Sequence, residues 1–162
     1  MRTQRQFLDE YRKTHSNPTN AWVHTICVPI ILFASIGMLW TLPLGLWVGL
    51  AAPLAPWVNG ATVVALLTLI FYATLSARAV LYMTAIFAVC AVIVIAMGNA
   101  GLPVLWICAA LWVAAWLGQF YGHHVEGAKP AFLDDVVFLL IGPLFILEKF
   151  NLLPSHTVAH AS

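Results

Sequence analysis

The sequence predicts an all-α integral membrane protein with about four transmembrane helices, an N-terminal amphipathic helix and a C-terminal broken interfacial or re-entrant hairpin. Hydrophobic residues make up 62% of the 162 residues and charged residues only 8%, whereas soluble domains are about 45–50% apolar. The apolar residues also come in runs close to the ~20 residues that a helix needs to cross a bilayer. The length suits one membrane domain, residues 1–162.

Residues 1–20 predict a surface helix followed by a break. Apolar and aromatic side chains recur among charges over residues 2–15, a pattern typical of a short amphipathic helix on a membrane surface. The segment Ser16-Asn17-Pro18-Thr19-Asn20 then interrupts this helix. Asn17 and Pro18 suit the cap and the first position of a new helix. No cleavable signal peptide is recognisable, so the first span is expected to be its own insertion signal.

Residues 21–120 predict the membrane spans. The four apolar runs are 21–40, 61–76, 79–97 and 102–120. Between the first two runs, the uncharged residues 41–60 are rich in Pro, Gly and Trp, which predicts a turn and a short or re-entrant segment at the interface.

Residues 121–162 are expected to form two parts: a segment that carries candidate site residues at the charged, cytoplasmic face of the membrane, and a tail at the membrane interface. The apolar run 132–153 begins with Asp134 and Asp135, which suit either a helix cap or the support of a histidine. Gly142-Pro143 interrupts this run, and each half is too short to cross a membrane, so a broken interfacial or re-entrant hairpin is expected.

The charges predict the orientation. With four spans, the N-terminus, the 76–80 turn and residues 121–162 share one side, and this side holds all seven Lys and Arg residues. The positive-inside rule makes this side, with both termini, cytoplasmic. The net charge is +1 and no basic patch is dense, so the lipid bilayer is the expected partner and nucleic acid is not.

Polar side chains concentrate in the stretch from Gln119 to Ala131, directly after the last apolar run. If the helix continues, Gln119, His123 and Glu126 lie on one face, and His124 lies about 100° round. Neutral imidazole and carboxylate suit iron, zinc or manganese. The alternative is a polar cap, in which these residues simply end a membrane helix in water.

The predicted topology brings His15 and His24 to the same membrane face as His123 and His124. The break at Asn17-Pro18 lets the first helix fold back, so that His15 and His24 can converge. A polar residue buried at the edge of a membrane is by default a candidate functional residue. Three further residues are candidates for orienting ligands or substrate: Tyr11, Asn20 and Gln119.

Three spaced motifs carry a resemblance to a known family. They are Tyr11-x3-His15-x4-Asn20-x3-His24-x4-Pro29, then Gln119-Phe120-x-Gly122-His123-x2-Glu126-x3-Pro130-Ala131, and finally Gly142-Pro143-x4-Glu148. Together they resemble the small membrane family that includes the fungal 2-hydroxy fatty acid dioxygenase of phytosphingosine breakdown. The motifs cover about half of the chain, and the spans between them match in hydropathy and length.

The resemblance implies an Fe(II)-dependent enzyme of fatty acid α-oxidation, which converts a 2-hydroxy fatty acid and O2 to the acid one carbon shorter. It maps the family's histidines onto His15, His24 and His123 as iron ligands, with His124 as a further candidate. Glu126 would ligate the metal or support its ligands, and Lys129 would attract the substrate carboxylate. The candidate catalytic residues are Glu126, Gln119, Asn20 and Tyr11.

Two other functions are compatible with the composition. A membrane di-iron hydroxylase also places histidines at the cytoplasmic face, but it needs more HxxHH-type clustering than this chain's six histidines provide. A non-enzymatic membrane scaffold or interaction protein needs no metal ligand. Transport is disfavoured because no charged residue falls at the middle of a predicted span.

Overall fold

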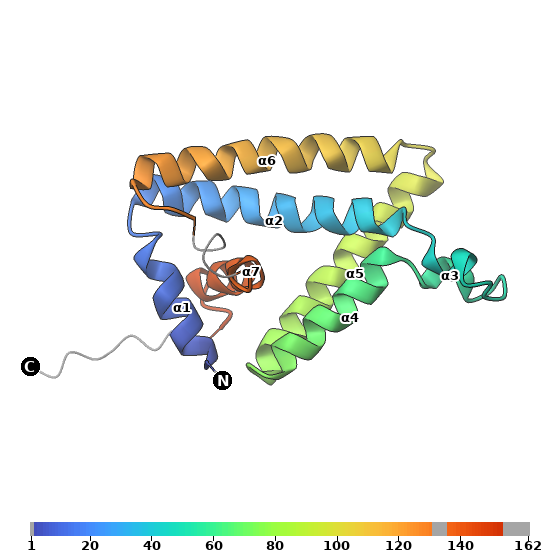
Figure 1. The fold of residues 1–162 in the computed structure, drawn as a ribbon, viewed down its shortest axis with the longest axis horizontal. Coiled ribbons are helices and arrows are strands. Elements are labelled where there is room, and N and C mark those ends of the chain that lie inside the picture. The colour runs from blue at the N-terminus through green and yellow to red at the C-terminus, as the bar shows by residue number, and fades with distance from the viewer. Residues whose placement is uncertain (1, 131–135, 154–162) are drawn as a thin grey trace, which may run out of the picture.

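A computed structural model describes residues 2–130 and 136–153 of the chain. Helices make up the regular structure of these residues (Figure 1). In chain order they are α1 (Gln4–Lys13), α2 (Pro18–Trp40), α3 (Leu44–Trp47), the 3-10 helix η1 (Ala55–Trp57), α4 (Gly60–Ala73), α5 (Ala77–Asn99), α6 (Val104–Glu126) and α7 (Phe138–Lys149).

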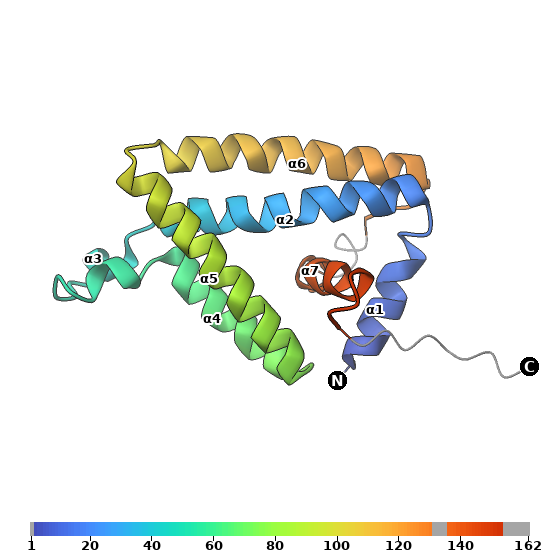
Figure 2. The ribbon, with the colours of Figure 1, turned by 180° about the vertical axis from the view of Figure 1, so that it is seen from behind.

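Two helix pairs form a wedge. Helices α2 and α6 run antiparallel and side by side, and α4 and α5 form the second pair (Figures 1 and 2). The pairs meet near α3 and diverge away from it, and α1 and α7 lie at the open end of the wedge. We call the meeting point of α2 and α4, at Leu39, Leu42, Gly60 and Ala61, the apex.

Close packing of α2 on α6 depends on two glycines one turn apart. A Cβ atom on Gly122 would lie 2.5 Å from Oδ1 of Asn20, and one on Gly118 would lie 2.7 Å from Sγ of Cys27. Small residues at such positions let membrane helices approach closely. The glycines of α6 therefore allow the polar N-terminal turn of α2 to lie directly against the end of α6.

The prediction of about four transmembrane helices is confirmed only in part. Among the described residues, three segments are long and apolar enough to cross a membrane: Pro18–Trp47, Ala77–Asn99 and Val104–Glu126. The remaining apolar helix, α4, has 14 residues, which extend about 21 Å at ~1.5 Å per residue. This length falls short of the ~30 Å hydrocarbon core, so α4 does not qualify as a span by itself.

The predicted helix and break near the N-terminus are confirmed. Thr3 caps α1, and Asn17 caps α2 with Pro18 in its first turn. The placement of the first helix differs from the expectation of a surface helix, because its apolar face is buried inside the protein. Phe7 and Tyr11 of α1 are buried against α7, where Phe7 meets Phe138 at a ring-centroid distance of 6.0 Å.

The predicted break at Gly142-Pro143 is wrong, because α7 is continuous through both residues. A Cβ atom on Gly142 would lie 3.2 Å from the hydroxyl of Tyr11 and 3.4 Å from Val28. The glycine therefore serves close packing on α1 and α2, and proline is tolerated inside membrane helices. The suggested roles of Asp134 and Asp135 lie outside the described residues.

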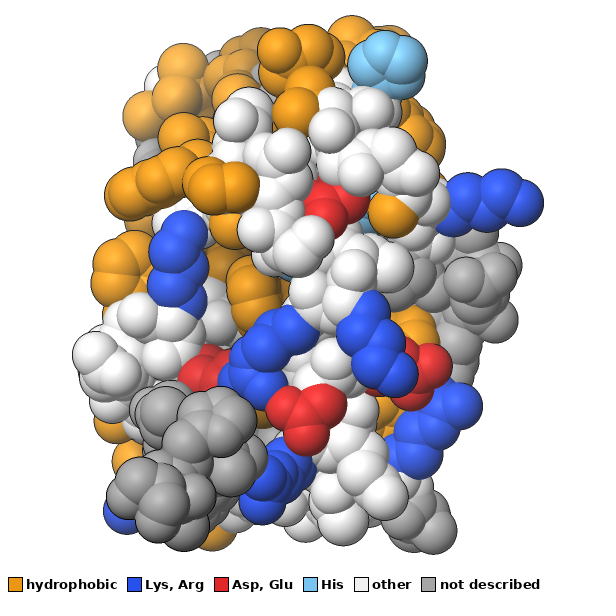
Figure 3. All heavy atoms as spheres, turned by 90° about the vertical axis from the view of Figure 1, so that its left-hand side faces the viewer, with side chains coloured by type: hydrophobic (Ala, Val, Ile, Leu, Met, Phe, Trp, Pro, Cys, Tyr) orange, Lys and Arg blue, Asp and Glu red, His pale blue; other side chains and the backbone are white. Residues whose placement is uncertain are grey.

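The ends of the helices fall into two groups (Figure 1). The start of α1, the turn between α4 and α5 and the end of α6 lie towards one side, and α3 and the turn between α5 and α6 lie towards the other (Figure 1). Figure 3 shows Lys, Arg, Asp and Glu side chains gathered on the face at the open end. The cytoplasmic orientation of that face stays a prediction.

Candidate metal centre

Three histidines from different parts of the chain meet between α1, α2 and α6. His15 lies between α1 and α2, His24 lies in the second turn of α2, and His123 lies in the last turn of α6. Their exposed fractions are 6%, 4% and 5%. One ligand nitrogen of each lies within 4.8 Å of the others, and Nε2 of His15 lies 3.1 Å from Nδ1 of His24.

The environment of His15 prepares it to bind a metal. Its Nδ1 lies 2.7 Å from the backbone carbonyl oxygen of Tyr11, which assigns the proton to Nδ1 and leaves the Nε2 lone pair facing His24. Burial lowers the pKa of His15 to about 4. The ring is therefore neutral at pH 7, which is the form that ligates metals.

Tyr11 contacts two of the three histidines. Its ring stacks on His15 at a centroid distance of 4.0 Å and an interplanar angle of 9°. Its hydroxyl lies 3.2 Å from Nδ1 of His24, and burial raises the pKa of this phenol. Tyr11 is thus a neutral group that orients His15 and His24, as outer-sphere partners of metal ligands do.

Glu126 accepts hydrogen bonds at the break between α1 and α2, in an arrangement that we call the Glu126 clamp (Glu126, Ser16, Asn17 and Asn20). Its carboxylate accepts from the backbone N–H and hydroxyl of Ser16 at 3.0 and 2.6 Å, the backbone N–H of Asn17 at 2.9 Å and Nδ2 of Asn20 at 3.1 Å. A carboxylate at the N-terminus of α2 is also favoured by the helix dipole. Because Ser16 follows His15 directly, the clamp holds His15 in position.

Asn20 completes the clamp from inside α2. Its Nδ2 also donates to the backbone carbonyl oxygen of Thr14 at 3.0 Å, so that one amide ties the residue before His15 to the end of α6. Asn20 is fully buried. The predicted candidates Tyr11, Asn20 and Glu126 therefore surround the histidines, although none of them belongs to the three-histidine group.

Two of the predicted site residues lie apart from the cluster. His124 and Lys129 are exposed, and the group that could hold a metal does not include His124. The helix continues through this stretch as expected, so the turn of about 100° per residue that directs His123 inward directs His124 away. His156 and His160 lie outside the described residues.

Several residues of the site were missed from the sequence. Ser16 was expected only to break the helix and Asn17 only to break it and cap the next one, yet both donate to Glu126. Glu148, although buried, pairs with Arg12 and thereby ties α7 to α1. A signal existed for Glu148, because one acidic residue inside an apolar helix needs a partner.

Two buried polar atoms beside the histidines indicate whether a metal and a polar ligand would fit at this site. Nδ1 of His123 and Oε1 of Gln119 are buried and have no hydrogen-bond partner within the described part of the chain. Leaving such an atom unsatisfied costs about 1–3 kcal/mol. A metal bound by imidazole nitrogens and a polar ligand beside Gln119 would satisfy these atoms, so the residues present fit both.

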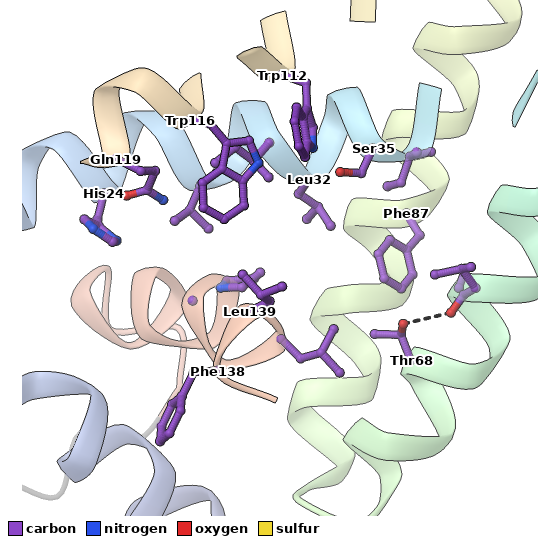
Figure 4. Close-up of a pocket in the computed structure, with 18 of the residues that line it drawn as sticks. His24, Leu32, Ser35, Thr68, Phe87, Trp112, Trp116, Gln119, Phe138 and Leu139 are labelled. Atoms are coloured by element: carbon purple, nitrogen blue, oxygen red, sulfur yellow. Dashed lines mark hydrogen bonds between the residues drawn. The ribbon is translucent and has the colours of Figure 1, made fainter. Parts of the chain in front are cut away.

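A cavity of about 290 Å³ extends from the histidines into the wedge (Figure 4). His15, His24, His123 and Gln119 line its polar end, which we call the head end. The rest of the wall is almost entirely apolar and comes from α2, α4, α5, α6 and α7. Figure 4 shows Leu32, Phe87, Trp112, Trp116 and Leu139 around this apolar part.

The fold and the site define an all-helical protein suited to a membrane, with a buried three-histidine group able to hold a metal at the polar end of an apolar cavity. The chain belongs to the Mpo1-like family, because the family model described as "2-hydroxy-palmitic acid dioxygenase Mpo1-like" matches residues 1–152. This match confirms the family that the sequence motifs resembled. No curated protein and no solved structure matches the chain.

Proposed function

We propose that the protein is an Fe(II)-dependent dioxygenase of fatty acid α-oxidation, which converts a 2-hydroxy fatty acid and O2 to the acid one carbon shorter. The observation that carries this proposal is the position of three buried histidines at the polar end of an apolar cavity. A 2-hydroxy fatty acid has the matching distribution of polarity, with its oxygens at one end and a long apolar tail.

His15, His24 and His123 would hold the metal. Imidazole suits iron, zinc and copper alike, but zinc does no redox chemistry, and the family description names a dioxygenase. Fe(II) is therefore the metal we propose. Its chemistry at this place would be Lewis-acid polarisation of the hydroxyl and carboxylate of the substrate together with activation of O2.

The overall reaction needs no reductant besides the substrate. Oxidising a 2-hydroxy acid to the shorter acid and carbon dioxide consumes one water and releases four electrons and four protons. One O2 accepts these four electrons and protons and yields two waters, so one water is formed net. The chain therefore needs to position only the acid, O2 and the metal, which is consistent with a site built from a few side chains.

The chain's own residues would bind and orient the substrate. The amide of Gln119 lines the head end with a buried oxygen that none of the described residues hydrogen-bonds, so it can accept a hydrogen bond from the 2-hydroxyl group. Tyr11 would keep His24 in place through its hydroxyl. The apolar wall excludes water from the tail, and burial of a tail contributes about 0.8 kcal/mol per methylene.

Product analysis tests the proposal. Detergent-purified protein is loaded anaerobically with Fe(II) and exposed to 2-hydroxypalmitate in air, and the acids are identified by mass spectrometry. We expect a C15 acid that depends on Fe(II) and is lost in His123→Ala. The neighbouring His124→Ala is the matched control and should retain product, because His124 is exposed.

The result also separates this function from that of a scaffold. A scaffold would bind no Fe(II) and form no product from any 2-hydroxy acid. Bound Fe(II) without product would refute the reaction while leaving the metal site in place.

A further inference from the structure

We propose that the apex of the wedge is an end stop that sets the longest acyl tail the cavity accepts, with Ala61 and Leu39 as the residues that determine it. This inference rests on the proposed function, because it takes a fatty acid as the ligand. It goes beyond the proposed reaction, because it assigns a role to residues of α2 and α4 that lie far from the histidines and contact no reacting atom.

The cavity follows one face of α2 from the histidines to the apex. Its wall contains His24, Val28, Leu32, Ser35 and Leu39, which recur at three or four positions and therefore share one side of the helix. In Figure 4, His24, Leu32 and Ser35 succeed one another along this helix. A tail whose head lies at the histidines would consequently run along α2.

The far end of this path is closed by backbone. A Cβ atom on Gly60 would lie 2.7 Å from the carbonyl oxygen of Leu39, and the N–H of Gly60 donates to the carbonyl oxygen of Leu42 at 3.1 Å. Two helices in backbone contact leave no space for a tail between them. The next residue, Ala61, is 4% exposed and lines the cavity, so its methyl group faces the last accessible part of the path.

The length of the path suits a long tail. His24 and Leu39 are about 22 Å apart along α2 at ~1.5 Å per residue. An extended, staggered carbon chain advances about 1.3 Å per carbon, given a bond length near 1.5 Å. The path therefore holds a tail of roughly 17 carbons.

Side-chain size along the path should then select tail length. The side chain of Ala61 is a single methyl group. A larger side chain at this position would therefore shorten the path by a few carbons. Ser35 lies one turn nearer to the histidines on α2, and a large residue at this position would shorten the path further. Leu39→Ala would act in the opposite sense and lengthen it.

The experiment compares tail-length profiles of the full-length protein and its variants. Protein loaded with Fe(II) is given saturated 2-hydroxy acids of 10 to 22 carbons in competition, and relative kcat/KM is read from the products. In Ala61→Leu we expect the ratio of kcat/KM for an 18-carbon to that for a 14-carbon acid to fall about tenfold or more, the discrimination typical of a few methylene groups. Ser35→Phe should lower the optimum further, and Leu39→Ala should raise it.

Ala73→Leu is the matched control, because it makes the same change on α4 at an exposed position outside the cavity wall. Its profile should equal that of the unaltered protein. The inference is overturned if Ala61→Leu and Leu39→Ala, both folded and metal-loaded, keep the original profile, or if they lose activity equally for all tails.

A second readout does not depend on turnover. The same saturated acids compete for the metal-free protein in detergent, and native mass spectrometry identifies those that stay bound. A shift to shorter acids in Ala61→Leu supports the end stop even if no product forms, in which case only the proposed reaction fails. An unchanged set of bound acids in both variants refutes the end stop by itself.

Discussion

The head end and the apex of the cavity are built from different interactions. At the head end, hydrogen bonds join α1, the break after it, α2 and α6 through Glu126, Asn20 and Tyr11. At the apex, Gly60 of α4 donates a backbone hydrogen bond to Leu42, just after α2, and the small residues Gly60 and Ala61 allow the two helices to meet. The head end depends on the direction and charge of its hydrogen-bonding groups, and the apex depends on the volume of its side chains.

The two kinds of interaction predict different effects of substitutions. Those at the head end should affect binding and reaction at the metal, and those at the apex should affect which tail length is preferred. Hydrogen-bonded networks lose their function as a unit when one member is removed. Packing surfaces respond in proportion to the volume that is added or removed. Changes at the head end should therefore weaken the binding of the metal or of the substrate's polar group, and changes at the apex should shift the preferred tail length.

The largest effect is expected for His24→Ala. His24 contacts both His15 and Tyr11, so its loss removes one ligand and releases the others. We expect Fe(II) content to fall to background and activity to fall by more than the roughly 100-fold that loss of an outer-sphere partner causes. Metal analysis and product formation measure this, and His124→Ala is the control. Retention of stoichiometric Fe(II) in His24→Ala would contradict the assignment.

A smaller effect is expected for Glu126→Gln, which tests the clamp without changing its shape. The new amide NH2 group would face N–H donors of Asn17 and Asn20, which now donate to a carboxylate oxygen. Loss of a charge-assisted hydrogen bond costs about 1.5–3 kcal/mol, and Fe(II) affinity should fall about 10–100-fold. Thermal unfolding and metal titration check both effects.

Glu10→Gln is the control for the clamp, because Glu10 is paired only at the surface, with Arg2. Surface pairs contribute about 0–1 kcal/mol, so this variant should keep its metal. An equal loss of Fe(II) in the two variants would show that net charge, and not the clamp, controls binding.

Gln119→Leu should separate stability from activity. The substitution removes a buried oxygen that has no hydrogen-bond partner among residues 2–130 and 136–153, so the free energy of unfolding should stay unchanged or rise by about 1 kcal/mol. It also removes the proposed partner of the 2-hydroxyl group, so KM should rise about tenfold with Fe(II) content unchanged. Kinetics and thermal unfolding test this, and a large loss of stability would mean that Gln119 is a structural residue.

The smallest effect is expected for Lys129→Ala. Lys129 was predicted to attract the substrate carboxylate, and it is exposed and absent from the residues that line the cavity. An exposed charge contributes through long-range attraction that salt screens, so we expect kcat/KM to change about twofold at low salt and to be unchanged at high salt. A tenfold effect that persists in salt would place Lys129 in direct contact with substrate.

Much of the architecture could be predicted from local patterns. The Asn17-Pro18 start of α2, the continuation of the last long helix through His123 and the convergence of His15 and His24 follow from capping rules and helical periodicity. The four-span arrangement was confirmed only in part, because α4 has 14 residues, and the break at Gly142-Pro143 was predicted wrongly. Local rules treat Gly142-Pro143 as a break, whereas packing against Tyr11 and Val28 makes the glycine part of a continuous helix.

The site was predictable in its ligand types but not in its geometry. His15, His24 and His123 were identified as candidates because few polar residues interrupt an apolar chain. His124 could not be separated from His123 by residue type, and only the direction of the helix face distinguishes them. The partners of Glu126 lie more than 100 residues away in the chain, and no local pattern indicates such contacts.

The sequence by itself determined that this protein is helical, apolar and equipped with imidazole ligands, because composition and periodicity act on each segment separately. Only the tertiary structure decided which histidines meet, that Glu126 holds the segment after His15, and that the cavity ends at Leu39 and Ala61. These features depend on how closely α2 can approach α6 and α4, and that distance is set by the summed packing of glycines and side chains from distant segments.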